Sequence, residues 1–491
     1  MDKDYLKRKL RGCLLGRGVG EALGRPFIGM NDPMDLTFYD PAPGENESLC
    51  NLDFQILWMR VLRKLPVGPV ADRDLFAQCW LDHVRYSENE YAVALRNLKN
   101  NIMPPWSGSF DNFYCDGFGA AHRAGLWAWL APTKCELAAQ LAYEDACVDH
   151  DSDGIYAALF IAALESAAFI ENDMNKLLEI GLSFIPKDCR LAAVIADARA
   201  FCAEKNDWME VRSALLAKYE CENLTDTVMN FGFIVAALLL GEGDFERSVL
   251  IAANCAKNTA ANAAIVGEIL GLLNPEEIPE KWLADLPHRL VLSENIVDVE
   301  DPPPTLDVFI ETLLELSEQV VLGEPLAADE PDWEQYLIPV KCGVFRKWSR
   351  LDERRTPPDM ECIKTSYTFP GCFSYLDSYE VPANSLYMME FEFKIEERKQ
   401  VRVIFNTNAV SRVWLDGEFA FGRDGGWMSP SYSSVPLNQY VDVEVEAGVH
   451  TLVVGVAPNE PDENIYWVMG VAGTLDRQWL PYTFFDNEEE V

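Results

Sequence analysis

Apolar residues recur at helical spacing over about the first 290 residues of the chain. The run from Glu136 to Asp173 alternates alanine-rich apolar faces with short polar interruptions. That spacing is typical of closely packed helices. The same pattern appears in three further segments, Asp188 to Lys205, Thr227 to Leu240 and Asp244 to Leu273. It predicts an all-helical (all-α) N-terminal domain over residues 1–290.

Two stretches interrupt this helical pattern, Met30 to Leu52 and Asn100 to Phe118, and both are rich in Pro, Gly, Asn, Asp and aromatic residues. They are predicted to be long loops, which on a helical scaffold often carry binding groups. Their aromatic residues either stack on a base or sugar or pack the loop itself. These aromatic candidates are Trp106, Phe113, Tyr114 and Phe118.

The pattern changes after residue 290. The acidic, proline-rich stretch VDVEDPPPTLD indicates a connector over residues 291–336, with one helix from about Leu306 to Val321. From about residue 337 polar and apolar residues alternate with a period of two, in short runs separated by DG and GG turns. Residues 337–491 are therefore predicted to form an antiparallel, jelly-roll-like β-sandwich.

Composition narrows the class of function. The formal net charge is -38, which disfavours nucleic acid and anionic membrane surfaces as partners. The 13 cysteines are dispersed without a CxxC motif, as in reduced proteins. The N-terminal apolar run is interrupted by Arg17 and Glu21, unlike a signal peptide, and no run is long enough to span a membrane. We therefore expect a cytoplasmic protein.

Three stretches of the N-terminal half follow one another in a recognisable order. They are RGCLLGRGVGEALGRPFIG at 11–29, LAYEDACVDHDSDGIYAALFIAALESAAF at 141–169 and TVMNFGFIVAALLLGEGDFERSVLIAANCAKNTAANAAIVGEILG at 227–271. Together with NPEEIPEKW, which follows the third, they resemble the ADP-ribosylglycohydrolase family over about residues 8–290. The resemblance implies a compact all-α hydrolase that usually binds two Mg²⁺ and cleaves the bond between ADP-ribose and its acceptor.

The same resemblance implies where an ADP-ribose-like ligand or another sugar would bind. Within the matched motifs Glu21 stands where the family usually has Asp, and Gly154 and Tyr156 match the family directly. The substrate-binding candidates are Glu21, Asn51, Gly154, Tyr156, Lys257, Asn258, Thr259 and Asn262.

The metal-binding acids of the family are largely missing. Asn258 and Ala260 stand at the two aspartate positions of the last motif, and Asp53 is the one carboxylate in the match to the first acidic motif. Two hard cations need clustered carboxylate oxygens. We therefore expect no metal cofactor, because the family's Mg²⁺ site is lost.

Three residues remain as catalytic candidates. Asp53 is the best surviving acid for activating water, and His150 either acts as an acid/base group or bonds the backbone at a helix start. Asp149, with the nearby Asp151 and Asp153, either serves glycoside hydrolysis without metal or forms a solvated acidic turn.

Lys257 lies beside the altered ligand positions and has two interpretations. Its ammonium either occupies part of the volume that a cation would fill or is a solvated charge at a helix start.

The C-terminal sandwich resembles accessory modules of the PA14 or galactose-binding kind, through VWLDGEFAFGRDGGWMSP and the later AGVHTL strand. Trp414, Trp427 and Tyr432 either form a carbohydrate-stacking platform or serve as core and interdomain contacts.

Two readings of the whole chain follow. In the first, it is a hydrolase-like pseudoenzyme that binds ADP-ribose or a related glycoside with reduced, altered or absent activity. In the second, it is an active ADP-ribosyl hydrolase that works without the metal pair and uses the sandwich for carbohydrate recognition. A shared fold does not separate them.

Overall fold

The computed structural model describes residues 1–64, 68–69, 73–86, 88–221, 223–321, 329–345, 364–368, 373–375, 386–428, 439–458 and 464–473. Contacts divide the chain into two units. The helical unit comprises residues 1–86, 103–109 and 114–328, and the sandwich unit comprises residues 87–102, 110–113 and 329–491.

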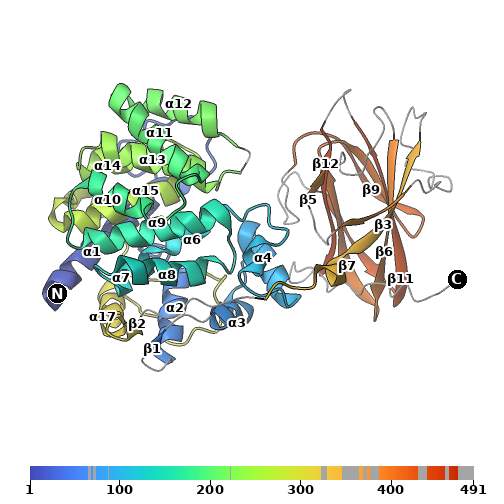
Figure 1. The fold of residues 1–491 in the computed structure, drawn as a ribbon, viewed down its shortest axis with the longest axis horizontal. Coiled ribbons are helices and arrows are strands. Elements are labelled where there is room, and N and C mark those ends of the chain that lie inside the picture. Colours follow the sequence, from blue (N-terminus) through green and yellow to red (C-terminus); the bar gives the residue numbers. More distant parts are fainter. Residues whose placement is uncertain are drawn as a thin grey trace. The chain divides into compact units, whose positions relative to one another are not determined.

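The helical unit is built from helices joined by short turns and by two long irregular segments, 28–52 and 284–305 (Figure 1). Aspartates begin several of them, since the side chains of Asp173, Asp207, Asp226 and Asp244 accept hydrogen bonds from first-turn amides. The helices are α1 Lys3–Gly24, α2 Asp53–Lys64, α3 Arg73–His83, α5 Trp106–Ser109, α6 Gly119–Arg123, α7 Gly125–Leu130, α8 Cys135–Ala146, α9 Ser152–Ala168, α10 Met174–Leu182, α11 Arg190–Glu204, α12 Trp208–Tyr219, α13 Thr227–Leu240, α14 Phe245–Asn254, α15 Thr259–Leu273, α16 Glu280–Leu283 and α17 Leu306–Ser317.

Helices α1 and α15 form the centre of this unit. Their backbones touch, because a Cβ added at Gly16 would lie 2.0 Å from the carbonyl oxygen of Gly267. One turn away, a Cβ at Gly12 would lie 2.4 Å from the carbonyl oxygen of Gly271. Every residue of α15 is buried. The glycine-rich motif of the sequence is therefore a packing motif, which brings the ends of α1 and α15 together.

One helical segment of the sequence is divided by a turn, and one expected helix end needs correction. The segment from Asp244 to Leu273 is two helices, because Ala256 and Lys257 adopt φ values of 65° and 64°, a left-handed conformation that ends α14 before α15 begins. The helix expected to reach Val321 ends at Ser317, and Val320–Val321 (β2) instead pairs in parallel with Gly68–Pro69 (β1).

The segment expected to be a connector, 291–336, is packed onto the helical unit over its first part. Helix α17 contacts α1, α2 and α7, and the Val297 amide donates to the carbonyl of His83. The contact-based boundary lies at residue 328, whereas the sequence places the end of the helical domain at 290. The assignment of domains by role stays a prediction.

The described residues of the sandwich unit form two antiparallel sheets, as the alternation predicts (Figure 1). One sheet has the order β4-β3-β6-β11-β8-β9 and the other β10-β7-β12-β5. The strands are β3 Ile338–Phe345, β4 Lys364–Thr368, β5 Phe373–Tyr375, β6 Leu386–Ile395, β7 Lys399–Thr407, β8 Val410–Leu415, β9 Glu418–Asp424, β10 Tyr440–Val445, β11 Gly448–Ala457 and β12 Tyr466–Gly473. The unit also contains helix α4, Asn89–Lys99.

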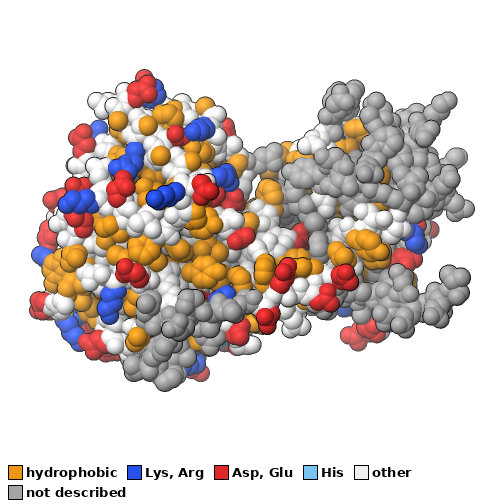
Figure 2. Space-filling model, viewed as in Figure 1, with side chains coloured by type: hydrophobic (Ala, Val, Ile, Leu, Met, Phe, Trp, Pro, Cys, Tyr) orange, Lys and Arg blue, Asp and Glu red, His pale blue; other side chains and the backbone are white. Residues whose placement is uncertain are grey.

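Alternate residues of these strands fill one apolar core. Val401, Val413 and Val454 are fully buried in it, consistent with the period of two. In the helical unit, acidic and basic side chains are spread over the visible face with apolar side chains between them (Figure 2). None of the helices that the structure describes is long and apolar enough to cross a membrane.

Candidate functional site

The first and last sequence motifs meet at the C-terminal turn of α1. The hydroxyl of Thr259, the first residue of α15, donates to the carbonyl of Gly24 at 2.6 Å. Both carboxylate oxygens of Glu21 accept from the backbone amide of Asn51, at 3.0 and 2.9 Å. The starts of α2 and α15 are therefore attached to the same turn, which defines the candidate site.

Asp53 is the first residue of α2 and is only 2% exposed. Its Oδ1 accepts from the backbone amide of Ser293 at 3.0 Å, and its Oδ2 accepts from Tyr86 Oη at 2.7 Å and from the Ser293 hydroxyl. Burial, followed by the nearby carboxylate, raises the pKa of Tyr86 to about 12. The carboxylate of Asp53 thus connects Ser293 and Tyr86 to the start of α2.

Lys257 and Asn258 lie at the turn before α15. The ammonium of Lys257 donates to Glu220 Oε1 at 2.8 Å and to Asn31 Oδ1 at 3.0 Å, and the residue is 5% exposed. Its charge is therefore paired within the protein. Asn258 is half-buried and its side chain makes no capping hydrogen bond to α15.

Asn262 belongs to the interior of the helical unit. Its Nδ2 donates to Asn230 Oδ1 at 2.9 Å, and Asn230 in turn donates to the carbonyl of Asp226 at 2.7 Å. Asn262 Oδ1 is buried without a hydrogen-bond partner among the described residues. Asn262 thus connects α15 to the start of α13.

Asp149 and His150 lie in a second, fully buried network. Arg123 contacts both oxygens of Asp149, at 3.0 and 2.5 Å, and its Nε donates to Asp145 at 3.0 Å. Nδ1 of His150 lies 2.8 Å from Asp149 Oδ1, and Nε2 accepts from the amide of Ala120 at 3.3 Å. Burial acts to raise the pKa of Asp149, but Arg123 and His150 hold it below its ordinary value. The catalytic assignment of this pair stays a prediction.

Gly154 and Tyr156 begin α9. A Cβ at Gly154 would lie 2.4 Å from the carbonyl of Cys115, so this glycine allows α9 to contact the 115–116 backbone. Tyr156 is half-buried, and burial raises the pKa of its hydroxyl. Of the acids flanking His150, Asp153 Oδ1 accepts from the Leu191 amide at 2.9 Å.

The sequence reasoning missed a buried charge cluster beside the candidate site. Arg17 donates to Glu268 Oε2 at 2.6 Å and to the carbonyl of Asn51 at 3.2 Å. Cys13, Glu165 and Glu268 offer potential ligand atoms that all lie within 4.8 Å of one another. The signal was Arg17 itself, a cation within the glycine-rich helix.

The sequence reasoning also missed Asp226, at the start of α13. Burial raises its pKa to about 6. Its Oδ1 accepts from the Met229 amide at 2.7 Å, and Oδ2 lies 3.7 Å from the guanidinium of Arg190. The carboxyl group of Asp226 therefore caps the start of α13 and has a raised pKa. The raised pKa results from burial, which the sequence alone does not reveal.

The residues at the candidate site do not fit the family's pair of divalent cations. Asp53 already accepts hydrogen bonds at both of its oxygens. Ala260 has no side-chain oxygen, and the side chain of Lys257 at the same turn ends in an ammonium paired with Glu220, which offers no ligand oxygen. Hard cations need several anionic oxygens free to bind them. The described side chains of this site therefore do not supply the free anionic oxygens that a metal pair requires.

The three sandwich candidates lie in different environments. Trp414 is 1% exposed and packs with Leu386 and Met388 in a second apolar cluster. Trp427 is 45% exposed. Tyr432 lies outside the described residues. Carbohydrate stacking by these side chains stays a prediction.

The solved structures that resemble this chain do so at low sequence identity. No curated protein matches the chain. A solved ADP-ribosylglycohydrolase-related protein complex is 18% identical with a TM-score of 0.44, covering 65% of this chain and 99% of that chain. An alpha-xylosidase from Xanthomonas citri is 14% identical with a TM-score of 0.18, covering 27% of this chain and 13% of that chain. A beta-glucosidase from Kluyveromyces marxianus is 9% identical with a TM-score of 0.21, covering 55% of this chain and 39% of that chain.

A family model provides the stronger evidence. The model described as ADP-ribosylglycohydrolase matches residues 1–313, more than half of the chain. The matched range contains the glycine-rich α1, the motif at Asp145 to Tyr156 and the turn at Lys257 to Asn262. The chain belongs to the ADP-ribosylglycohydrolase family.

Proposed function

We propose that the helical unit binds ADP-ribose or a related glycoside where α2 and α15 meet the end of α1, without the metal pair of the family. Hydrolase activity is reduced, altered or absent. Family membership supports the ligand class, and the convergence of the two motifs on Glu21 and Gly24 supports the place.

One observation supports the proposal that the helical unit works without the metal pair. The surviving carboxylate, Asp53, is occupied by Ser293 and Tyr86, while Asn258 and Ala260 stand where the family has acids. Three donors fill most of the acceptor positions of this carboxylate, and Asp53 is only 2% exposed, so little of it is open to a water molecule. Ligand binding does not require access to Asp53, because the hydroxyl groups of a sugar can form hydrogen bonds with other polar groups at this turn.

The polar groups around this turn suit a ribosyl phosphate compound. Asn51 is exposed and Asn258 is half-buried, and an amide both donates to and accepts from sugar hydroxyls. Arg25, paired with Glu21 at 2.7 Å and Glu47 at 2.9 Å, brings a cation to the same end of α1. The first amides of α15 favour negative charge.

We also propose that the sandwich is an accessory module of the PA14 or galactose-binding kind that aids carbohydrate recognition. Supporting features are the turn at Asp416 and Gly417, with φ values of 50° and 85°, and the exposed ring of Trp427. Asp416 Oδ2 also lies 2.7 Å from Nδ1 of His450, which joins this turn to β11.

A thermal-shift titration with ADP-ribose tests the binding proposal, because a ligand of the folded state alone raises the melting temperature. We expect equal stabilisation in Mg²⁺ and in chelator. Asn258→Ala should weaken binding about tenfold, the loss of one well-placed hydrogen bond. Asn172→Ala, the same change at an exposed loop residue, is the matched control and should bind like wild type.

The other outcomes of this titration are equally informative. Stabilisation that requires Mg²⁺ would contradict the loss of the metal site, and no shift in either buffer would remove ADP-ribose as the ligand. Release of ADP-ribose from a modified protein substrate in chelator would instead establish the active, metal-independent hydrolase. In that case Asp53→Asn is the first variant to assay for turnover.

A further inference from the structure

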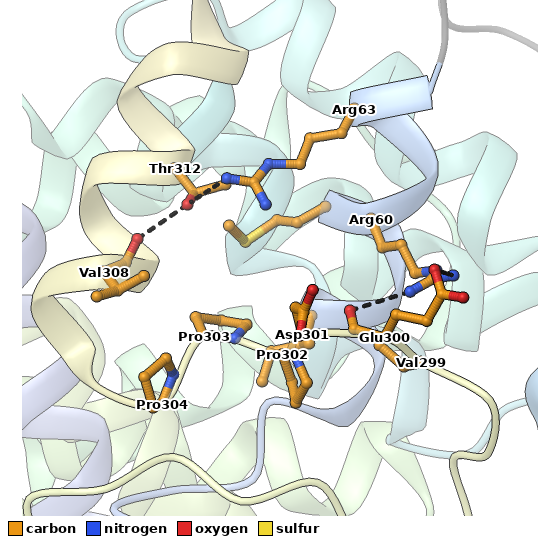
Figure 3. A pocket seen from close by; sticks show the side chains of 12 residues that line it. Arg60, Arg63, Val299, Glu300, Asp301, Pro302, Pro303, Pro304, Val308 and Thr312 are labelled. Carbon is orange, nitrogen blue, oxygen red and sulfur yellow. Dashed lines mark hydrogen bonds and ion pairs between the residues drawn. The ribbon is translucent and has the colours of Figure 1, made fainter.

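A cavity in the helical unit lies along α2, the helix that begins with Asp53 of the candidate site. It has a volume of about 420 Å³ and is bounded by α2, the segment 299–304 and α17 (Figure 3). This volume is within the range of small-molecule sites. Its lining residues are Ile56, Met59, Arg60, Arg63, Val299, Glu300, Asp301, Pro302, Pro303, Pro304, Val308 and Thr312.

The walls of this cavity are fixed in place. Three consecutive prolines restrict the backbone of the 299–304 segment. The carbonyl of Pro304 accepts from the amide of Leu290 at 3.0 Å. Arg60 donates to the carbonyl of Glu300 and to its Oε2, each at 3.0 Å. A wall that is ordered before a ligand arrives reduces the entropic cost of binding.

Two opposite charges remain for a ligand after these pairs are made. Arg63 Nη2 donates to the hydroxyl of Thr312 at 3.1 Å, and that hydroxyl donates onward to the carbonyl of Val308 at 2.9 Å. Neither Arg63 nor Asp301 forms an ion pair with any residue in the described part of the chain. Figure 3 shows Arg63 extending from α2 to Thr312, and Asp301 on the facing segment.

We propose that this cavity binds a small amphipathic zwitterion, of the class of dipeptides with apolar side chains. Its carboxylate pairs with Arg63, its ammonium pairs with Asp301, and its apolar body lies against Ile56, Met59 and Pro303. The apolar part of the lining supplies the hydrophobic contribution to binding. The two charged groups fix the orientation of the ligand.

Electrostatics favour a zwitterion over a simple anion. Arg60 and Glu300 neutralise each other, and Arg63 and Asp301 have opposite charges, so the cavity is neutral as a whole. The chain has a net charge of -38, which repels anions at long range. A neutral molecule with separated charges avoids that repulsion and satisfies both cavity residues.

Isothermal titration of the full chain with leucyl-phenylalanine tests the proposal. We expect saturable binding, weakened about tenfold or more when the dipeptide is N-acetylated or C-amidated, since each modification removes one charged hydrogen bond. Glycyl-glycine, which keeps both charges but lacks the apolar body, should bind more weakly. No saturable heat with leucyl-phenylalanine would overturn the proposal.

Variants locate the binding. Arg63→Gln and Asp301→Asn should each weaken binding of leucyl-phenylalanine about tenfold, and both residues are exposed enough for the chain to stay folded. Arg247→Gln on α14, an exposed arginine outside the cavity, should bind like wild type. Unchanged affinity in both cavity variants would overturn the assignment. Because the ligand differs from ADP-ribose, this test is independent of the proposed function.

Discussion

At the scale of single residues, one glycine of the helical unit is constrained because its backbone approaches buried carboxyl groups. Gly125, the first residue of α7, faces the carboxyl groups of Glu165 and Glu268. A Cβ at this position would lie 2.1 Å from Glu268 Oε1 and 3.0 Å from Glu165 Oε2. Glu268 cannot move away freely, because it is bound to Arg17. Glycine is therefore required here by space.

Gly125→Ala is expected to lower the free energy of unfolding by about 2–3 kcal/mol, the usual cost of overpacking a core. Chemical denaturation followed by circular dichroism measures it. Gly44→Ala is the matched control, because its nearest neighbour at 3.3 Å is the flexible end of Glu47. A destabilisation no larger than that of Gly44→Ala would mean that the carboxyl groups of Glu165 and Glu268 are not held against α7.

At the scale of elements, one buried charge cluster joins α1, α9 and α15. Arg17 from α1 is fully buried and ion-paired with Glu268 from α15. Glu165 from α9 forms no ion pair with the residues that the structure describes, and its Oε2 accepts from Trp129 Nε1 at 3.2 Å. Burial, then the neighbouring Glu268, raises the pKa of Glu165 well above its ordinary value of 4.5. We infer that Glu165 is protonated when the chain is folded.

This assignment predicts a pH dependence of stability. A carboxyl group whose pKa is higher in the folded chain binds more protons in the folded than in the unfolded state. Its contribution to the free energy of unfolding is therefore complete below about pH 4.5 and is lost as the pH rises. Glu165→Gln keeps the neutral form at every pH. Between pH 5 and 8 the free energy of unfolding of Glu165→Gln should rise relative to that of wild type, by up to about 1.4 kcal/mol per pH unit.

Urea denaturation at several pH values measures this difference. Glu268→Gln is the matched comparison, because it leaves the buried Arg17 without its counter-ion. It should destabilise the chain by about 3 kcal/mol. Parallel stability curves for wild type and Glu165→Gln would contradict the protonated assignment.

At the scale of the whole molecule, the chain forms two units with separate cores. The helical core is centred on α1 and α15, and the sandwich core lies between its two sheets. Units with their own cores are able to unfold separately.

We expect two transitions in differential scanning calorimetry. Val249→Ala in α14 and Val454→Ala in β11 make the same change at fully buried positions of the two cores. Each should destabilise its own unit by about 2 kcal/mol and leave the other transition unchanged. A shift of both transitions by either variant would show that the units unfold together.

Features of the fold that depend on neighbouring residues were predicted from the sequence, whereas features that depend on contacts between distant segments were not. Helical and strand periodicity predicted α11, α13 and the strands β6 to β12, because burial of one face acts on neighbouring residues. A helix start at Lys257 was one of the two predicted alternatives and agrees with α15, which begins at Thr259. The positive φ values of Ala256 and Lys257 were not predicted, since neither residue type favours them. The helix predicted to reach Val321 ended early because a parallel pairing with a distant segment replaced its last turn.

By itself the sequence determined the fold class, the family and the absence of acids at residues 258 and 260, because these depend on residue types and their order. The tertiary structure alone decided that Asp53 is occupied by Ser293 and Tyr86, and that Lys257 is paired with Glu220. It also decided that Arg63 and Asp301 face one cavity. These partners lie far apart along the chain, and only folding brings their charges within reach of one another.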